Sequence, residues 1–507
     1  MDKTALSQHN KPGRADAVRG PGLLTVAAIL VVAAGGLRAT HLEQPLLNFH
    51  PTRQYRSALI TRACYFDRTR GPADPLRQVA TANRSLQPVA EPPLMEWLAC
   101  RTYLFLGHES LSAARAYAAG FWLLGALPLY GVARRVSSPS AAVAGLAVYL
   151  FLPYGVVASR AFQPDALMTC CALWATLGLS RYYELDPEVD QHRRQWRLFV
   201  AAAGIAVAAL VKPMSVFFTV PAAIGLASAN SGTFAVFRRP VTLAPVALGL
   251  APALAYYAYG AVFGTLARDQ MRLRFVPSLV VTSFFFDGLA TQVQRVFGWP
   301  VFMAGIVGTM VAHRSSARRV LLWMWIGYAA FAIAFTYHMP THDYYHLPFI
   351  ALAGFATATL VHRIPNSIAH LVIACAVAGA GAIVAWPRLQ PGNLPARTAL
   401  YQEIGQLAEH TTQAIFLDLE YGYPLMYHGL VSGDAWPNRD DLAAEAMGGA
   451  SPVDAATRLD NDYSPHVTHF IVTDLDSLAA QPDLQQLLGE RTRLVHQTPS
   501  YHIYRFN

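Results

Sequence analysis

Cationic side chains gather in the stretch HPTRQYRSALITRACYFD, residues 50–67, directly after the first strongly apolar part of the chain. Arg53, Arg56 and Arg62 lie in this stretch, and within it no acidic residue precedes Asp67. An arginine guanidinium binds two phosphate oxygens at once and keeps its charge in any protein environment. The stretch therefore predicts a binding site for an anionic group such as a phosphate.

Four further motifs carry residues that can act on a phosphate or on a proton. Lys212 in LVKPMS adds a point charge, and the motif EPPLMEWL begins with Glu91. SRAFQPDALM and HMPTHDYYHLP supply the remaining candidates, which are Arg160, Asp165, His342, Asp343, Tyr344, Tyr345 and His346. Cations stabilise the charge that develops on a leaving phosphate, and a carboxylate takes the proton of an attacking hydroxyl or amine.

Each motif also has a purely structural interpretation. Asp165 follows Pro164 and can complement a helix dipole, while Lys212 can extend to the membrane interface as an anchor. The tyrosines fit an aromatic belt, and the arginines can neutralise lipid phosphates non-specifically. Loop histidines are seldom metal ligands, so we expect no cofactor and no divalent metal. The functional interpretation rests on the convergence of separate loops on one face.

The composition indicates that membrane helices position these groups. Of 507 residues, 54% are hydrophobic and 14% are charged, and the mean hydropathy is +0.29. Soluble domains carry about 25% charged residues, so the chain is predicted to be a polytopic membrane protein. The formal net charge of +8 comes from basic residues dispersed among loops, which does not favour a nucleic-acid partner.

The predicted fold class is mainly α, with about eleven transmembrane helices and a C-terminal α/β part. Apolar runs long enough to cross the bilayer predict helices near 21–37, 112–133, 141–158, 165–183, 198–211, 214–229, 241–262, 298–312, 320–337, 345–361 and 367–386. We interpret the first as a retained anchor rather than a cleaved signal peptide. The stretch 92–107 is interrupted by Glu96 and Arg101, so it is predicted to lie at the interface.

The distribution of basic residues among the loops predicts the orientation of the chain in the membrane. Sixteen Lys and Arg side chains fall in the predicted inner segments and six in the short outer loops, three of these six being Arg268, Arg272 and Arg274. The bias predicts a cytoplasmic N-terminal tail (1–20), a membrane part (21–386) with a long outer loop (38–91), and an outer C-terminal domain (387–507). The expected location is the bacterial inner membrane, with the C-terminal domain periplasmic or extracellular.

The C-terminal part changes composition abruptly. Strand-like segments cover 414–419, 468–475 and 493–506, and a helical segment covers 396–410, which together predict a small α/β domain. Cys64 and Cys100 would share the outer compartment, where a disulfide can form, but the sequence does not decide whether they pair.

Four motifs follow one another along residues 20–390: RSALITRACYF, EPPLMEWL, SRAFQPDALM and HDYYHLP. In this order they resemble the membrane glycosyltransferases of the GT-C superfamily. The resemblance is to the branch of the protein O-mannosyltransferases and the aminoarabinose transferase. It implies inverting transfer of a sugar from a polyprenyl-phosphate carrier to a glycan, lipid or protein acceptor on the outer face. It also implies that the arginines, Lys212 and the His/Tyr motif handle the carrier phosphate.

One departure from the family pattern concerns the catalytic base. Family members carry an acidic residue in the first outer loop, where this chain has Arg53 and Gln54 or, in another alignment, Arg56. Glu91 at the end of the same loop is the expected substitute, followed by Asp165, Asp343 and Asp67. Two alternatives remain open: a non-catalytic scaffold that binds carrier lipid, and a transporter of lipid-linked sugars, although we find no inverted repeat.

Overall fold

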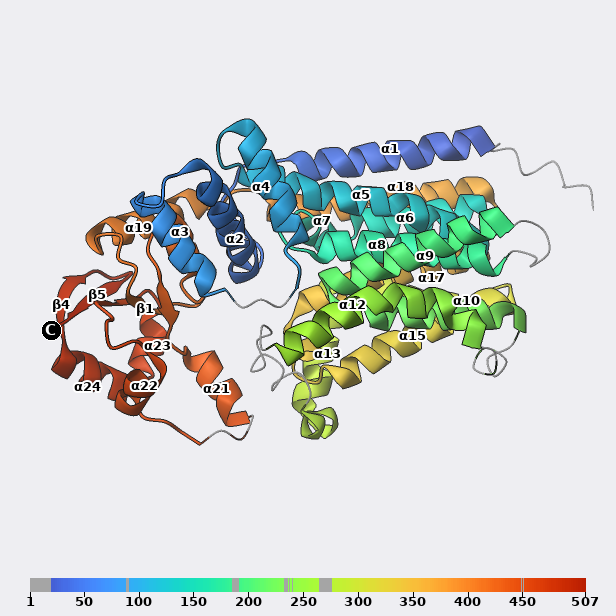
Figure 1. Cartoon of the computed structure of the whole chain (residues 1–507). Coiled ribbons are helices and arrows are strands. Elements are labelled where there is room, and N and C mark those ends of the chain that lie inside the picture. The colour runs from blue at the N-terminus through green and yellow to red at the C-terminus, as the bar shows by residue number, and fades with distance from the viewer. Residues whose placement is uncertain are drawn as a thin grey trace, which may run out of the picture.

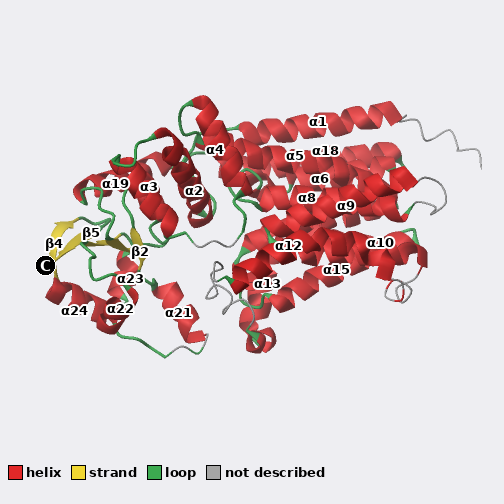
Figure 2. Cartoon of the chain, viewed as in Figure 1, coloured by secondary structure: helices red, strands yellow, loops and turns green. Residues whose placement is uncertain are grey.

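The computed structural model describes residues 20–87, 91–184, 191–231, 236, 238, 240–263, 276–447, 449 and 451–507. A bundle of long helices forms one end of the molecule, and a smaller part that contains the only strands drawn forms the other (Figures 1 and 2). The predicted N-terminal tail, apart from Gly20, and the loop with Arg268, Arg272 and Arg274 lie outside the described residues.

The bundle contains a helix at each of the eleven predicted ranges. These helices are α1 (Gly20–Ala39), α5 (Leu111–Val136), α6 (Pro139–Phe151), α7 (Pro153–Ala158), α8 (Asp165–Tyr183), α9 (Gln191–Val211), α10 (Val216–Ser231), α12 (Ala244–Val262), α14 (Trp299–Met310), α15 (Ser315–Ala334), α17 (Ile350–Val361) and α18 (Ser367–Leu389). The predicted helix 141–158 is divided into α6 and α7 because Pro153 has no backbone N–H to continue the helix.

Membrane-spanning character follows from length and apolar composition. Among the described residues, seven helical segments are long and apolar enough to cross a bilayer, and three shorter apolar helices accompany them. The chain is therefore a multi-pass membrane protein, whereas the number of eleven crossings stays a prediction.

Small residues bring the central helices close together. The backbones of Gly145 in α6 and Gly354 in α17 approach so closely that a Cβ atom at either position would meet the carbonyl oxygen of the other. Helices in a bilayer gain no hydrophobic driving force from one another and associate through such close contacts. α17 is thereby fixed in the centre of the bundle, and its N-terminal extension carries the tyrosine motif.

Three helices cover one end of the bundle and form what we call the cap: α2 (Pro51–Thr69), α3 (Pro75–Ser85) and α4 (Leu94–Leu106). A disulfide between Cys64 and Cys100 joins α2 to α4, which answers the question that the sequence left open. α4 matches the predicted helix 92–107, and its exposed Trp97 and Phe105 fit a helix at a membrane interface.

The C-terminal part is a five-stranded sheet with helices. Its elements are α19 (Leu394–Leu407), β1 (Ala414–Leu417), α20 (Tyr423–His428), β2 (Gly433–Ala435), α21 (Arg439–Met447), α22 (Ala455–Asp462), β3 (His469–Val472), α23 (Leu475–Ala479), α24 (Pro482–Arg491), β4 (Thr492–Gln497) and β5 (His502–Phe506). The strand order is β2-β1-β3-β5-β4, with β1 parallel to β2 and β3 and the β3–β5 and β5–β4 pairs antiparallel. The predicted segment 493–506 is two strands, β4 and β5, because a turn at Pro499–Ser500 separates them.

The cap lies between the bundle and the sheet (Figure 1). Glu420 accepts hydrogen bonds from the backbone N–H and the hydroxyl of Thr52, at 3.2 and 2.7 Å. At the other side, Asn83 of α3 donates to the carbonyl of Val431 at 3.1 Å. The predicted boundary between the membrane part and the C-terminal domain stays a prediction, and α18 continues to Leu389, beyond the predicted helix end at 386.

Candidate functional site

A buried ion pair lies where α8 and α9 meet the cap. Lys212 Nζ lies 2.6 Å from Asp165 Oδ1, and the two side chains are only 2% and 5% exposed. Asp165 is the first residue of α8, and Lys212 has extended backbone after α9 because Pro213 follows it. Asp165 Oδ2 is buried and has no hydrogen-bond partner among the described residues, so the pair keeps an acceptor available for a ligand.

Aromatic rings cover the ammonium group of Lys212. Tyr344 and Tyr345 belong to the short 3-10 helix η5 (Asp343–Phe349) that precedes α17. Lys212 Nζ lies 4.8 and 5.5 Å from the centres of these two rings, and the guanidinium of Arg53 lies 5.3 Å from the centre of Tyr344. Cation–π contacts of this kind are attractive and strengthen where water is excluded. Two cations from distant segments thus share one aromatic wall.

Asp343 anchors this wall through a network that the sequence did not predict. Its Oδ1 lies 2.5 Å from His50 Nε2 and accepts a hydrogen bond from the Tyr154 hydroxyl at 2.7 Å, and its Oδ2 lies 3.4 Å from Arg295. His50 precedes α2 with φ +42°, a conformation unusual for a residue with a side chain. Its position directly before Pro51, a residue typical of a helix start, is a signal in the sequence that could have drawn attention to it.

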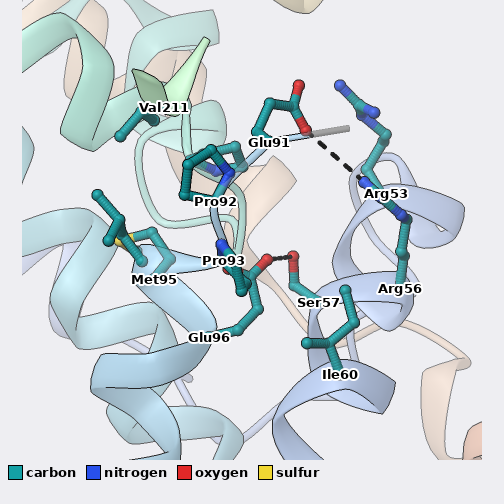
Figure 3. A pocket seen from close by; sticks show the side chains of 12 residues that line it. Arg53, Arg56, Ser57, Ile60, Glu91, Pro92, Pro93, Met95, Glu96 and Val211 are labelled. Carbon is teal, nitrogen blue, oxygen red and sulfur yellow. Dashed lines mark hydrogen bonds and ion pairs between the residues drawn. The ribbon is translucent and has the colours of Figure 1, made fainter. Parts of the chain in front are cut away.

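A pocket opens beside Arg53 and Arg56 (Figure 3). Glu91 reaches toward Arg56 with 3.9 Å between carboxylate and guanidinium, and both side chains keep partial exposure, 16% and 18%. Deeper in the pocket, the Ser57 hydroxyl donates a 2.6 Å hydrogen bond to Glu96. Burial raises the pKa of Glu96 above the ordinary carboxylic value, and the bond from Ser57 opposes this shift.

The pocket also contacts the helices that hold the ion pair. Pro164 and Val211, the residues directly before Asp165 and Lys212, line it together with Glu91. No hydrogen-bond acceptor or carboxylate among the described residues pairs with the guanidinium of Arg53, whose contact is the face of Tyr344. An incoming anion can therefore bind Arg53 without breaking an existing ion pair.

The structure assembles most of the candidate residues and separates three. Those brought together are Arg53, Arg56, Glu91, Asp165, Lys212, Asp343, Tyr344, Tyr345 and His342, whose ring lies 5.5 Å from that of Tyr344. His346 is buried away from them, with the Tyr328 hydroxyl and the Met339 carbonyl as hydrogen-bond partners. These bonds fit a structural role, and the assignment of His346 to phosphate binding stays a prediction.

Arg62 and Arg160 also have protein partners of their own, and their assignment to phosphate binding stays a prediction. Arg62 donates to both carboxylate oxygens of Glu109 and to the carbonyl of Tyr427 at 2.6 Å, so it ties the cap to α20. Arg160 is 1% exposed and donates to the carbonyl of His41 at 2.8 Å. The weaker base candidate Asp67 pairs with Arg77 on an exposed surface.

Metal ligands are a separate question. Among the residues that the structure describes, no group of three or more His, Cys, Asp and Glu side chains could hold a metal ion. His338 and His342 stack with ring centres 5.0 Å apart, but a third ligand is missing there within the described ranges. The expectation that the chain needs no metal stays a prediction.

Comparison with known proteins identifies the fold. Residues 90–259, which include Glu91, Asp165 and Lys212, match the family of dolichyl-phosphate-mannose-protein mannosyltransferases. The crystal structure of ArnT from Cupriavidus metallidurans in the apo state aligns over 95% of this chain and 98% of that chain, with a TM-score of 0.60 and 15% identity. The chain has the GT-C glycosyltransferase fold.

Two other structures agree with the GT-C assignment. ArnT from the same organism bound to undecaprenyl phosphate aligns with a TM-score of 0.58 at 14% identity, covering 95% of this chain and 97% of that one. The Archaeoglobus fulgidus oligosaccharyltransferase AglB, in complex with an inhibitory peptide and a dolichol-phosphate, covers 96% of this chain and 74% of its own, with 13% identity and a TM-score of 0.52. No curated protein matches the chain. The resemblance drawn from four short motifs is thus confirmed at the level of the GT-C fold.

Proposed function

We propose that the protein is an inverting membrane glycosyltransferase that moves a sugar from a polyprenyl-phosphate carrier to an acceptor on the extracytoplasmic face. The observation that carries the proposal is the convergence of Arg53 and Lys212 on the ring of Tyr344. Three segments far apart in the sequence place two cations and an aromatic wall at one end of an apolar bundle. The match to carrier-dependent transferases and the GT-C fold support the same function.

The carrier phosphate binds between Arg53 and Lys212 in this proposal. The guanidinium of Arg53 offers a pair of parallel N–H donors, and Lys212 supplies a point charge and the N–H groups that Asp165 does not take. When the bond between the sugar and the phosphate breaks, these charges stabilise the phosphate that leaves. Tyr344 and Tyr345 exclude water from the cations and so strengthen their interaction with the phosphate.

Glu91 acts as the base and takes the proton of the attacking acceptor group. Asp165 forms the ion pair with Lys212, and Asp343 is held by His50, Tyr154 and Arg295, so both have other tasks. Glu91 keeps partial exposure, and its one ion pair with a described residue is the long contact to Arg56, which leaves its carboxylate accessible in the pocket. The acceptor oxygen or nitrogen then bonds to the sugar carbon as the carrier phosphate departs, and the proton moves to Glu91.

The affinity for the carrier lipid tests the phosphate clamp, by which we mean the binding of the carrier phosphate between Arg53 and Lys212. Arg53→Ala should lower the affinity of the purified protein for polyprenyl phosphate by roughly ten- to a hundredfold, since charge-assisted hydrogen bonds contribute about 1.5–3 kcal/mol each. Arg68→Ala is the matched control, because Arg68 lies on the same helix, is exposed and bonds only to Cys64 among the described residues. Equal affinities for both variants would refute the clamp.

The orientation is tested separately. Asp440→Cys in α21 should react with a membrane-impermeant maleimide on intact cells, while Ser315→Cys at the start of α15 should react only after permeabilisation. Both positions are exposed, and Ser315 begins the helix that follows the predicted inner residue Arg314. The reverse labelling pattern would place the sheet in the cytoplasm and contradict transfer on the extracytoplasmic face.

A further inference from the structure

A second cavity also borders Arg53 and Arg56 and lies between the first turns of α2 and the sheet. It measures about 830 Å³ including its open mouth, and Gln87, Tyr421, Tyr423 and Asp434 line it together with the two arginines. The pocket beside Glu91 and this cavity therefore share the same two guanidinium groups. A ligand in the second cavity would contact the same two cations that border the pocket of Glu91.

The carboxyl end of strand β1 lies next to this cavity. In parallel sheets, ligands bind outside the carboxyl ends of the strands, near the point where the strand order reverses. β1 has β2 on one side and β3 on the other, so the reversal lies at β1, and the loop that follows β1 reaches the cavity. The carboxyl end of β1 thus meets the start of α2.

The loop after β1 is built rigidly. Asp418, which is buried, accepts hydrogen bonds from the backbone N–H groups of Glu420 and Gly422, and the Thr473 hydroxyl after β3 also donates to it. Tyr421 and Gly422 both have positive φ, +56° and +74°, and a Cβ atom on Gly422 would collide with Phe416. A backbone held in these conformations fixes Tyr421 and Tyr423 at the cavity wall.

Two buried polar atoms, one in the cavity wall and one beside it, lack a hydrogen-bond partner among the described residues. Gln87 is 4% exposed, and its Nε2 donates to Asn83, but its Oε1 has no hydrogen-bond partner among the described residues. Ser432, next to the cavity residue Gly433, has a buried hydroxyl in the same condition. Buried polar atoms are nearly always paired, so a ligand with hydroxyl groups would complete the wall.

We propose that this cavity is the acceptor site and that it binds a saccharide. The inference rests on the proposed glycosyl transfer and names the class of acceptor. Tyrosine rings stack on the C–H faces of a sugar, while Asp434, Gln87 and Thr52 bond its hydroxyl groups. The reacting saccharide hydroxyl would then lie at Arg56, which borders both spaces, where Glu91 can reach its proton. Among the described residues of the lining, the large apolar side chains are Leu86 and Met426, too few to suit a lipid tail.

Saccharide binding can be measured without turnover. Full-length protein in nanodiscs would be titrated with a panel of hexose, N-acetylhexosamine and deoxyhexose oligosaccharides, using saturation-transfer NMR to detect binding. Asp434→Asn and Gln87→Met should each weaken binding of the recognised oligosaccharide at least tenfold. Asp440→Asn is the control, because Asp440 is a highly exposed carboxylate in nearby α21. Polyprenyl phosphate affinity is measured on the same samples.

The two proposals fail in different ways. Loss of saccharide binding in both cavity variants, with unchanged polyprenyl phosphate affinity, supports the acceptor site. No binding of any oligosaccharide by the wild-type protein, or equal binding by wild type and variants, overturns it. Carrier affinity that falls together with saccharide binding assigns the cavity to the donor and also overturns it. Failure of the wild type to bind polyprenyl phosphate contradicts the proposed function while the saccharide measurement still stands.

Discussion

Lys212 and Asp165 form an ion pair of 2.6 Å at the meeting point of α8 and α9, and both side chains are almost completely buried. Burying two charges costs free energy that their attraction seldom exceeds, so such pairs are poor devices for stability alone. Lys212 also contacts the ring of Tyr344, which Arg53 of the cap contacts as well. This placement fits a cation kept charged and oriented for a ligand.

Removing one partner of this pair separates stability from binding. Lys212→Met should lower the free energy of unfolding by about 3–5 kcal/mol, because Asp165 is left buried and unpaired. The double variant Lys212→Met with Asp165→Leu should recover most of that stability and none of the polyprenyl phosphate affinity. Thermal unfolding in detergent and lipid binding measure the two effects. Recovery of affinity in the double variant would show that Lys212 has a structural role only.

Glu91→Gln should reduce sugar transfer by on the order of a hundredfold or more, because an amide takes no proton at neutral pH. Carrier affinity should not fall, since the substitution removes a negative charge close to Arg56. The measurement is transfer or release of label from a polyprenyl-phosphate sugar in membranes. Asp67→Asn is the control, and near-normal turnover by Glu91→Gln would move the assignment to Asp165 or Asp343.

Acid should loosen the contact between α20 and the cap. His428 accepts a hydrogen bond of 2.7 Å from the Tyr55 hydroxyl, and burial together with the nearby charge of Arg62 lowers the pKa of His428 to about 4. The unfolded chain protonates this histidine near pH 6.5, so its contribution to stability is complete above that pH and is lost as the pH falls toward 4.

The pH dependence of thermal unfolding tests the role of His428. The wild-type midpoint should decrease between pH 6.5 and 4, and His428→Gln should flatten the curve in that window, because glutamine accepts the same hydrogen bond without titrating. Tyr427 and Arg62, which surround the imidazole, stay unchanged in this variant. Identical slopes for the two proteins would assign the acid sensitivity to other groups.

The disulfide between Cys64 and Cys100 should stabilise the cap. Its sequence separation of 36 residues corresponds to about 3–4 kcal/mol in the chain-entropy description of the unfolded state. Cys64→Ser should therefore lower the unfolding midpoint, and Cys375→Ser in α18 should not. Thiol alkylation before and after reduction, followed by mass spectrometry, checks whether the bond forms in membranes. Free thiols at both positions in the untreated protein would contradict the structure.

Much of the fold could be predicted from the sequence because apolar length and turn residues are local signals. Each predicted helix of the bundle has a counterpart, and the strands near 414–419 and 468–475 are present as β1 and β3. β2 was missed because it has three residues, Gly433–Ala435, and depends on pairing with β1. A short edge strand of this kind leaves no periodic pattern in the sequence.

The sequence supplied candidate residues for the site, but it did not predict which of them contact one another. Lys212, Asp165, Tyr344 and Arg53 were selected by residue type, but the sequence does not reveal which acid neutralises which cation. Arg62 and Arg53 could not be distinguished in the stretch 50–67. They lie more than two turns apart on α2, and of these two arginines Arg62 forms the ion pair with Glu109. His50 was missed because its role depends on Asp343, which the helix η5 places beside it.

α1 and α18 lie side by side and both pack against α6, and Gln44 after α1 donates to the carbonyl of Leu389, 345 residues away. The cap and the sheet therefore emerge from the same corner of the bundle, although the chain must insert every intervening helix first. Glu420 cannot reach Thr52 until synthesis is almost complete. A chain that ends before α18 would therefore lack the cavity that Arg53 and Arg56 form with the C-terminal part. In the proposed function, the acceptor cavity forms only after the last bundle helix and the sheet have been made.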